Sequence, residues 1–495
     1  MMSAHEPPSG TSTELQRFTF QNPPNAMAVS NTVKPTTDFG VFPPEIWMVI
    51  RDILEKKDDR ATLAPLARCN SKFADLMHSH LYKRFITKIP GTDRNRSFTG
   101  FTAAVSKSPR LASFVKIVKI DITDPEEDFF VEPIGNTPIC LVNMDPQLAM
   151  QLYTSINGDE GSISQLTVAI MEALPTLLPN LMELHTHSGI IYEDASPWRS
   201  SHVRFWAERH PNNRLLSLKD VTVTHRPKYH YTPFLIVAQW CLVAPNLQSI
   251  TMRIISADDE EDPDIRIHRW KDFQMVSWET SLSATLNNLR YLNFECEEPG
   301  EAVEIFHFLW HFRKLDRVDL RIVPSDLLDE DGVRGYCLML SNHLWVSREP
   351  WLKAAVSPAI MPTTPPSGYL LGELFTLKYQ TNIKFMKVGQ DMLMLAAMIR
   401  GGQGSASDRE SKMLVNFLPR SLETLCIMDV DRKCISAIRL LTEDVLRGCY
   451  PELQNFAVAA ISKSTGRAPT DEEMMQIQRY VRRTKLKIIM VRLTD

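Results

Sequence analysis

A leucine-led pattern of alternating apolar and polar positions recurs along most of this chain. Each copy has a leucine, two variable residues, an apolar residue, one variable residue and usually another apolar residue, as at positions 247–252. An alternation with a period of two residues is typical of a β-strand with one buried face. The copies begin at Leu181, Leu218, Leu247, Leu289, Leu315, Leu422, Leu453 and Leu486, and a related pattern begins at Phe114. We therefore expect one strand in each copy.

Stretches of helix-like sequence lie between these copies, most clearly at residues 165–178, 233–243 and 302–312. One strand and one helix per unit is typical of a leucine-rich-repeat solenoid. The copies here are irregularly spaced and lack the usual asparagine ladder. The pattern predicts an α/β fold, with an irregular repeat domain over residues 95–495. The alternative is a βα-rich globular domain whose buried strands happen to begin with leucine.

The repeat pattern is interrupted near residues 325–415. Residues 361–368 are rich in proline and threonine, and residues 401–407 are rich in glycine and serine. Both compositions are typical of loops. We therefore expect a loop-rich insertion in this part of the repeat domain.

Near the N-terminus the apolar positions change to a helical spacing. They form one stripe of Ile46, Val49, Ile50, Ile53 and Leu54, which Trp47 and Met48 widen. Pro44 suits the first helical position, because the N–H that it lacks has no partner there. Lys56 and Lys57 suit the C-terminal end of the helix. So wide an apolar surface on a short helix must pack on more than one partner helix.

Two further short helices are expected after this one. The second contains Leu63 and Leu66, and it accommodates Pro65 only if it begins near Thr62, which leaves the proline in the first turn. The third follows at residues 71–82. Together the three helices form a small module ahead of the repeats.

The composition of the chain narrows the class of protein. The chain has 495 residues, of which 44% are hydrophobic, so a small module and a large domain or repeat array are expected. A formal charge of −4 predicts no strong attraction to nucleic acid or to an anionic membrane. The eight cysteines form no Cys-x-x-Cys pair, which favours free thiols in a reduced compartment.

The sequence also bears on where the protein is expected in the cell. Residues 1–38 show no signal-peptide pattern, and their Pro, Ser, Thr and Asn content predicts a disordered lead. No apolar run is long enough to span a bilayer. We therefore expect a protein of the cytoplasm or nucleus, with no membrane partner.

Motifs for catalysis are not found. The sequence has no Gly-x-Gly-x-x-Gly, P-loop, Gly-x-Ser-x-Gly or His-Glu-x-x-His pattern. His307 and His311 are four residues apart, as in zinc sites, but no third ligand stands at a suitable spacing. We expect no enzyme activity, no cofactor and no metal site. An enzyme of unrecognised type is the alternative.

Residues 39–90 resemble an F-box. The similarity rests on Phe42-Pro43, Glu45-Ile46, Ile50, Leu54, Asp58-Asp59, Leu63, Leu66, Cys69, Phe73, Leu76 and Leu81-Tyr82. Phe42 in place of leucine and Pro65 inside the second helix depart from the family pattern. F-box proteins of the kind common in fungi pair this module with a substrate-reading domain, often of leucine-rich repeats.

The resemblance implies the substrate-recognition subunit of a Skp-cullin-F-box ubiquitin ligase. The F-box would bind a Skp-type adaptor and, through it, a cullin-RING ligase, while the repeat domain would bind the protein to be ubiquitinated. The implied adaptor-binding residues are Phe42, Pro43, Glu45, Ile46, Trp47, Ile50, Leu54, Leu63 and Leu66. A scaffold that binds the adaptor without presenting a substrate is the alternative.

The variable strand positions should face the open side of the sheet. They mix both charges with one aromatic residue, which suits a protein partner more than a polyanion. The candidate substrate-binding residues are Glu183, His185, His187, Arg253, Tyr291, Arg317 and Arg321, with Ser249, Thr251, Asn293, Glu295 and Asp319 beside them.

Overall fold

The structure of the chain is a computed structural model with two compact units, Met1–Lys57 and Asp58–Asp495. The residues that it describes are 44–56, 60–69, 77–89, 92–122, 173–188, 215–225, 243–254, 288–296, 314–322, 380–400, 406–461 and 467–492, with a few single residues between them. The expected disordered lead at residues 1–38 lies outside them.

The described part of the first unit is one helix, α1 (Pro44–Lys56), which confirms the predicted N-terminal helix. Pro44 occupies its first position, where a missing N–H leaves no intrahelical bond unmade. Glu45 stands in the first turn, where its charge interacts favourably with the helix dipole.

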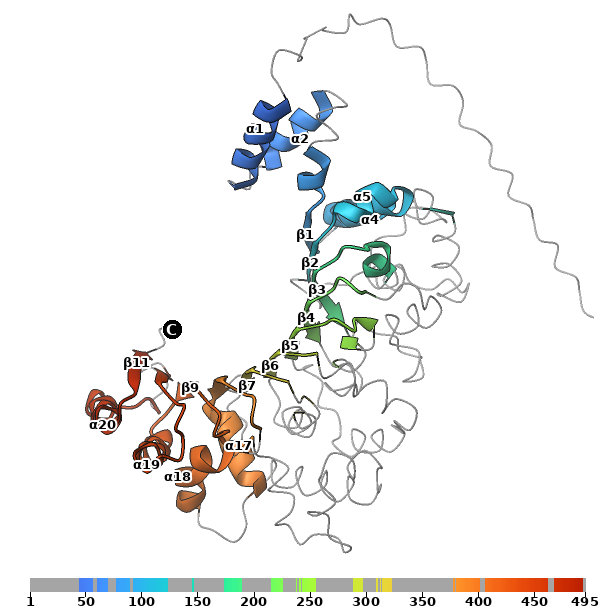
Figure 1. Ribbon diagram of the computed structural model, residues 1–495. Coiled ribbons are helices and arrows are strands. Elements are labelled where there is room, and N and C mark those ends of the chain that lie inside the picture. The colour runs from blue at the N-terminus through green and yellow to red at the C-terminus, as the bar shows by residue number, and fades with distance from the viewer. Residues whose placement is uncertain are drawn as a thin grey trace, which may run out of the picture. The chain divides into compact units, whose positions relative to one another are not determined.

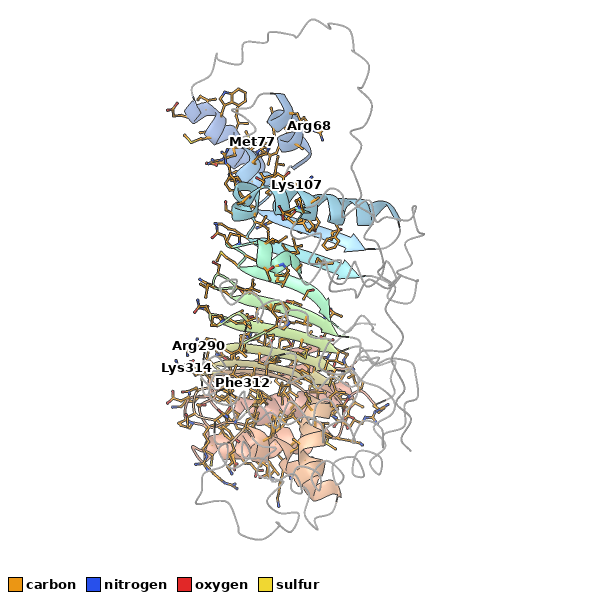
Figure 2. All side chains as sticks on the ribbon, turned by 90° about the vertical axis from the view of Figure 1, so that its right-hand side faces the viewer. Arg68, Met77, Lys107, Arg290, Phe312 and Lys314 are labelled. Atoms are coloured by element: carbon orange, nitrogen blue, oxygen red, sulfur yellow. The ribbon has the colours of Figure 1, made fainter. Side chains whose placement is uncertain are left out.

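The second unit is built on an 11-stranded sheet whose strands follow one another in chain order (Figures 1 and 2). Every neighbouring pair is parallel. The strands are β1 (Arg84–Ile89), β2 (Ile117–Ile122), β3 (Glu183–Ser188), β4 (Asp220–His225), β5 (Ser249–Ile254), β6 (Tyr291–Cys296), β7 (Arg317–Ile322), β8 (Phe385–Gly389), β9 (Thr424–Val430), β10 (Asn455–Ala460) and β11 (Lys487–Arg492). The predicted α/β class is confirmed, and each leucine-led copy supplies one strand.

The motif leucines lie just before the strands, in buried turns. Leu247 precedes β5 by two residues, and its N–H donates to the carbonyl of Ala244 at 3.0 Å. The N–H groups of Gln248 and Ser249 then both donate to the carbonyl of Lys219, which stands just before β4. The same turn recurs before the neighbouring strands, so the leucine closes each turn and fixes the start of the strand.

A ladder of polar side chains links these turns, and it stands before the strands and not after them, where leucine-rich repeats carry their asparagines. At the position before the motif leucine, Asn180, Asn246 and Asn288 donate from Nδ2 to backbone carbonyls that precede the neighbouring strand, at 2.7–2.8 Å. Ser217 donates to the carbonyl of Pro179 at 2.9 Å, and Ser421 donates to that of Ile383 at 2.8 Å. The ladder was missed because these residues stand outside the strand pattern.

Further helices of the second compact unit pack against the sheet or against one another. Their bounds are α4 (Thr92–Lys107), α5 (Pro109–Phe114), α17 (Gln390–Arg400), α18 (Ala406–Phe417), α19 (Cys434–Leu446) and α20 (Asp471–Arg482), with a 3-10 turn, η2, at Leu174–Leu177. Helix α17 contacts β7, β8 and β9, α4 contacts β1, and α20 contacts β11. Apart from η2 and a few single residues, the helices expected at 165–178, 233–243 and 302–312 lie outside the described residues.

The expected insertion at residues 325–415 is partly regular structure. Strand β8 and helices α17 and most of α18 fall inside this range and form a strand-and-helix unit like the others. The sequence hid this unit because Ile383 takes the place of the motif leucine. Residues 323–376 lie outside the described residues.

Two boundaries of the N-terminal module also need correction. Strand β1 begins the sheet inside residues 39–90, so the region expected to be all helical ends in a strand. Helix α2 (Arg60–Cys69) begins earlier than expected and holds Pro65 in its interior. Pro65 is the sixth residue of α2, so the helix lacks the bond that an N–H at this position would donate to the carbonyl of residue 61.

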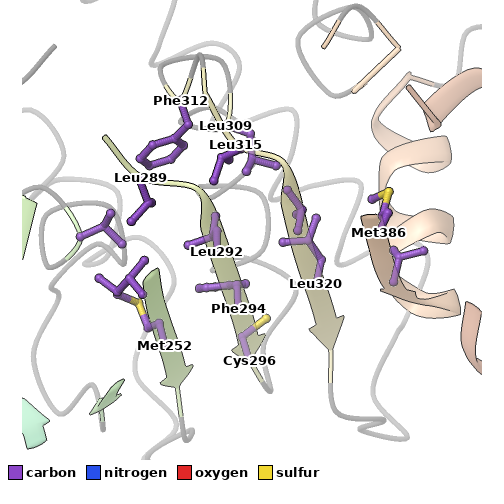
Figure 3. Packing of buried hydrophobic residues seen from close by; sticks show 14 of the residues in the cluster. Met252, Leu289, Leu292, Phe294, Cys296, Leu309, Phe312, Leu315, Leu320 and Met386 are labelled. Carbon is purple, nitrogen blue, oxygen red and sulfur yellow. The ribbon is translucent and has the colours of Figure 1, made fainter. Parts of the chain in front are cut away.

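The core lies between the sheet and the segments that cross from strand to strand. Alternate strand residues such as Leu292, Phe294 and Leu320 are fully buried. Figure 3 shows these side chains in a layer, with Leu309 and Phe312 of a connecting segment beside them. The other half of each strand's side chains therefore forms the opposite surface of the sheet.

Candidate functional site

The surface of the sheet opposite the core is the candidate site, and we call it the open face. It consists of the strand residues that alternate with the core. Its middle row crosses eight strands in register, through Lys119, His185, Thr222, Thr251, Asn293, Asp319, Lys387 and Cys426. Every candidate substrate-binding residue lies on this face by register, although the side chain of His187 is outside the described part.

An ion-pair chain joins β2 to β3 on the open face. Lys119 Nζ lies 2.7 Å from Glu183 Oε1, and His185 Nε2 lies 2.9 Å from the same oxygen. Partial burial raises the pKa of Glu183, but the hydrogen bonds from Lys119 and His185 outweigh it, and the pKa falls below its ordinary value. Burial and the nearby Lys119 charge lower the pKa of His185. His185 is therefore a neutral member of this chain at neutral pH.

A second network centres on Asp319 of β7. Tyr291 Oη donates to Asp319 Oδ2 at 2.8 Å, and Arg317 donates to the same oxygen at 3.1 Å. The Arg317 guanidinium lies between two rings, 4.6 Å from the centre of Tyr291 and 4.5 Å from that of Phe385. Burial and the Asp319 carboxylate raise the pKa of Tyr291 to about 12. These contacts hold Arg317 in one orientation.

A third pair crosses an intervening strand. Arg321 of β7 donates two hydrogen bonds to Asp429 of β9, at 2.8 and 2.9 Å. Gly389 of β8 lies beneath them, and a Cβ there would stand 3.4 Å from Arg321 Cγ and 3.7 Å from Asp429 Oδ2. The glycine therefore makes room for the pair, as expected where a strand is approached closely.

The backbone of β9 aims Asp429 at this arginine. The register between β9 and β10 shifts after Val458, and Asp429 has a left-handed φ of 56°. A bulge with one residue in this conformation redirects a side chain. Neither Asp429 nor Gly389 was identified from the sequence. An isolated glycine at the end of a strand pattern is the one signal that could have indicated them.

A carboxyl group with a shifted pKa stands beside this pair. Burial, followed by the charges of Asp431 and Asp429, raises the pKa of Asp391 to about 6. Gln390 is buried next to it and accepts a hydrogen bond from the N–H of Asp431 at 2.8 Å. Among the described residues, no group of three His, Cys, Asp or Glu side chains has the arrangement of a metal site.

A further ion pair of the open face is exposed, and burial suppresses the reactivity of Cys241. Arg253 lies 3.4 Å from Glu295, and Arg253 is 61% exposed, so solvent weakens this pair. Cys241, Cys426, Cys434 and Cys449 form no disulfide bond. Burial raises the pKa of Cys241 to about 12, which removes its nucleophilic form at neutral pH. The open face therefore offers mainly hydrogen bonds, paired charges and shape.

The other candidate surface is α1. Val49 is 54% exposed and Ile53 is 48% exposed, and Ile46 is exposed on the same side of the helix. Trp47, Ile50 and Leu54 are half-buried, and Glu45 is exposed. Val49 and Ile53, which were absent from the implied adaptor site, are thus its most exposed apolar residues.

The remaining residues implied for adaptor binding are less exposed or lie outside the described part. In the second unit, Leu63 is buried and Leu66 is half-buried. Phe42 and Pro43 lie outside the described residues. No described helix is both long and apolar enough to cross a membrane.

Neither the scan of protein-family models nor the search of curated proteins found a match for this chain. The functional argument therefore depends on these two surfaces.

Proposed function

We propose that this chain is a non-catalytic substrate-recognition subunit of a Skp-cullin-F-box ubiquitin ligase. The F-box would be the N-terminal helical module, and an irregular leucine-rich-repeat domain would follow it. The observation that carries this proposal is the exposed apolar side of α1. The proximity of a bound target to the ligase would supply its function, by making ubiquitin transfer effectively intramolecular.

The exposed side of α1 has the pattern of a helix that packs on a partner. Ile46, Val49 and Ile53 fall at i, i+3 and i+7, which places them on one side of a helix. A cluster of exposed apolar side chains marks a protein-interaction site, because its burial on binding is favourable. Trp47, half-buried beside them, is of the residue type that most often dominates binding energy at interfaces.

The open face supports the second half of the proposal. Its acidic and basic groups are paired with one another, within β7 or across strands, so it presents no continuous charge of one sign. Such a surface has no strong attraction for a polyanion and suits a folded or extended protein. Its sheet geometry also gives a wide, regular platform on which the target would lie.

Adaptor binding is the direct test. We expect Val49→Asp with Ile53→Asp to abolish capture of a purified Skp-type adaptor, because two carboxylates would have to be buried in an apolar interface. The matched control is Asp52→Asn, which changes an exposed side chain of the same helix. Equal capture by the double variant and the unaltered chain would refute the adaptor interface. Thermal unfolding of each variant checks that the sheet unit remains folded.

A scaffold that binds the adaptor without presenting a substrate is the second candidate. The observation in its favour is that the charges of the open face are already paired with one another, which leaves few strong attachment points. Quantitative proteomics after deletion of the protein separates the two. A substrate receptor predicts that specific proteins accumulate, whereas a scaffold predicts that none does.

A further inference from the structure

Strand β11 is the outermost strand of the described sheet, next to β10 only (Figure 1). In a parallel ladder, a residue directs both its N–H and its C=O to one neighbouring strand, and the next residue directs both to the other side. The N–H of Lys487 donates to the carbonyl of Gln454 at 2.8 Å. Ile488, Met490 and Arg492 therefore direct their backbone groups away from β10, toward the edge.

The side chains of β11 are unusually apolar for an exposed edge. Ile489 is 64% exposed and Val491 is 52% exposed, both on the open face. They continue an uncharged surface, because Ile489 is in register with Ala457 of β10, and Val491 with Ala459. Natural proteins normally protect such an edge by charge or by a covering segment.

Helix α20, which packs against β11, carries an ordered distribution of charge on its exposed side. Asp471 and Glu472 are exposed at its N-terminal end, and Arg479 and Arg482 are exposed toward its C-terminal end. Met475, 50% exposed, lies between them. Arg492 of β11 pairs with Asp471 at 3.0 Å, so the acidic end of α20 lies at the C-terminal end of the strand. This edge therefore has one acidic end and one basic end.

We propose that this edge binds the same edge of a second copy of the chain, with the two β11 strands antiparallel. A two-fold axis at Met490 would join the sheets through the outward-directed backbone groups of Ile488, Met490 and Arg492. Ile489 would then stand opposite Val491 of the second copy, so that the exposed apolar side chains of both strands cover one another. A two-fold interface requires such a self-complementary surface.

Charge complementarity selects a second copy as the occupant. An antiparallel arrangement brings Glu472 of one copy toward Arg479 and Arg482 of the other, twice by symmetry. Met475 would meet its own counterpart near the axis. A parallel arrangement would instead set like charges against each other, which is unfavourable.

Cysteine cross-linking tests the pairing and its register. Across a non-hydrogen-bonded antiparallel pair, Cα atoms are about 4.5 Å apart, which is within the range of a disulfide. We expect that a mixture of Ile489→Cys chains and Val491→Cys chains, carrying different affinity tags, forms a disulfide-linked pair on oxidation. Each variant alone should give no more cross-linking than the unaltered chain, which controls for its native thiols. Absence of the mixed product, or efficient cross-linking of Ile489→Cys alone, would overturn the proposal.

Sedimentation analysis gives a second, independent measurement. The double variant Ile489→Lys with Val491→Lys should raise the dimer dissociation constant about tenfold or more, because like charges would face each other in the interface. The control is Leu446→Lys, which changes another exposed apolar residue, on α19, and should leave the dimer intact. A full-length chain that sediments as a monomer at all concentrations, or a control that dissociates equally, would contradict the interface.

Discussion

The open face differs between its first strands and its last. From β2 to β8, Lys119, Glu183, Tyr291 and Arg317 are held by hydrogen bonds or ring contacts with neighbouring strands. From β10 to β11, the corresponding positions are alanine, isoleucine and valine, apart from Asn455 and Lys487. Fixed polar groups suit a reversible and selective contact, since they are already ordered and remain solvated. Exposed aliphatic groups suit a contact that stays buried.

The largest effect on stability is expected at the most buried ion pair of the open face, between Arg321 and Asp429. Arg321→Ala would leave the Asp429 carboxylate, whose side chain is 5% exposed, without its two-bond partner. We expect unfolding free energy to fall by about 2–3 kcal/mol, measured by urea denaturation. The double variant Arg321→Ala with Asp429→Asn should recover part of this loss, because it leaves no buried charge without a partner. A loss below that of an exposed pair would mean that the crossing pair contributes little.

Gly389→Val tests the space beneath the same pair. The added Cβ would lie 3.5 Å from Arg321 Cα, and the valine methyl groups would come closer to that backbone. We expect a loss of about 1–3 kcal/mol in unfolding free energy, because the neighbouring strands cannot easily move apart. The control is Gly100→Ala in α4, where nothing lies within 4 Å and a small gain is expected. An unchanged stability for Gly389→Val would refute this account.

The carboxyl group of Asp391, which lies beside the Arg321–Asp429 pair, should make the stability of the folded chain depend on pH. Its pKa in the folded chain, about 6, is raised from 3.8. Between these values the folded state keeps a proton that the unfolded state has released, so stability falls as pH rises through the window. Asp391→Asn should therefore match the unaltered chain near pH 4 and be more stable above about pH 7. An equal gain in stability at both pH values would show that it does not come from the ionisation of Asp391.

The smallest effect is expected at the exposed pair on the open face. Arg253→Ala removes the 3.4 Å contact with Glu295, and we expect a change below about 0.5 kcal/mol in unfolding free energy. The same substitution should weaken target binding if the open face carries the substrate. Unaltered stability with reduced capture of a target would separate a binding role from a structural one.

The strands were predictable because each leucine-led copy combines a buried turn residue with alternating side chains. Leu247 and Leu289 lie in such turns, and β5 and β6 follow at the expected positions. Strand β8 was missed because Ile383 replaces the leucine, so a search on one residue type excluded a unit with the same geometry.

Fewer features of the candidate site than of the strands could be predicted from the sequence. The candidate residues of the open face were found because a period of two residues separates the surfaces of a sheet. The partner of Arg321 is Asp429, which is two strands away and aimed by a bulge, so no local pattern contains it. The same limit applies to Asn180, whose partner is the distant carbonyl of Ser113.

The chain-order arrangement of the strands has a consequence for how the molecule unfolds. Each strand forms its backbone ladder only with the adjacent strands, so disruption of one strand spreads first to those beside it. Separation can therefore start at a free end and advance one strand at a time. The backbone amides of β5 to β7 should then exchange hydrogen with solvent most slowly, and those of β1 most quickly, together with those of β11 in the monomer.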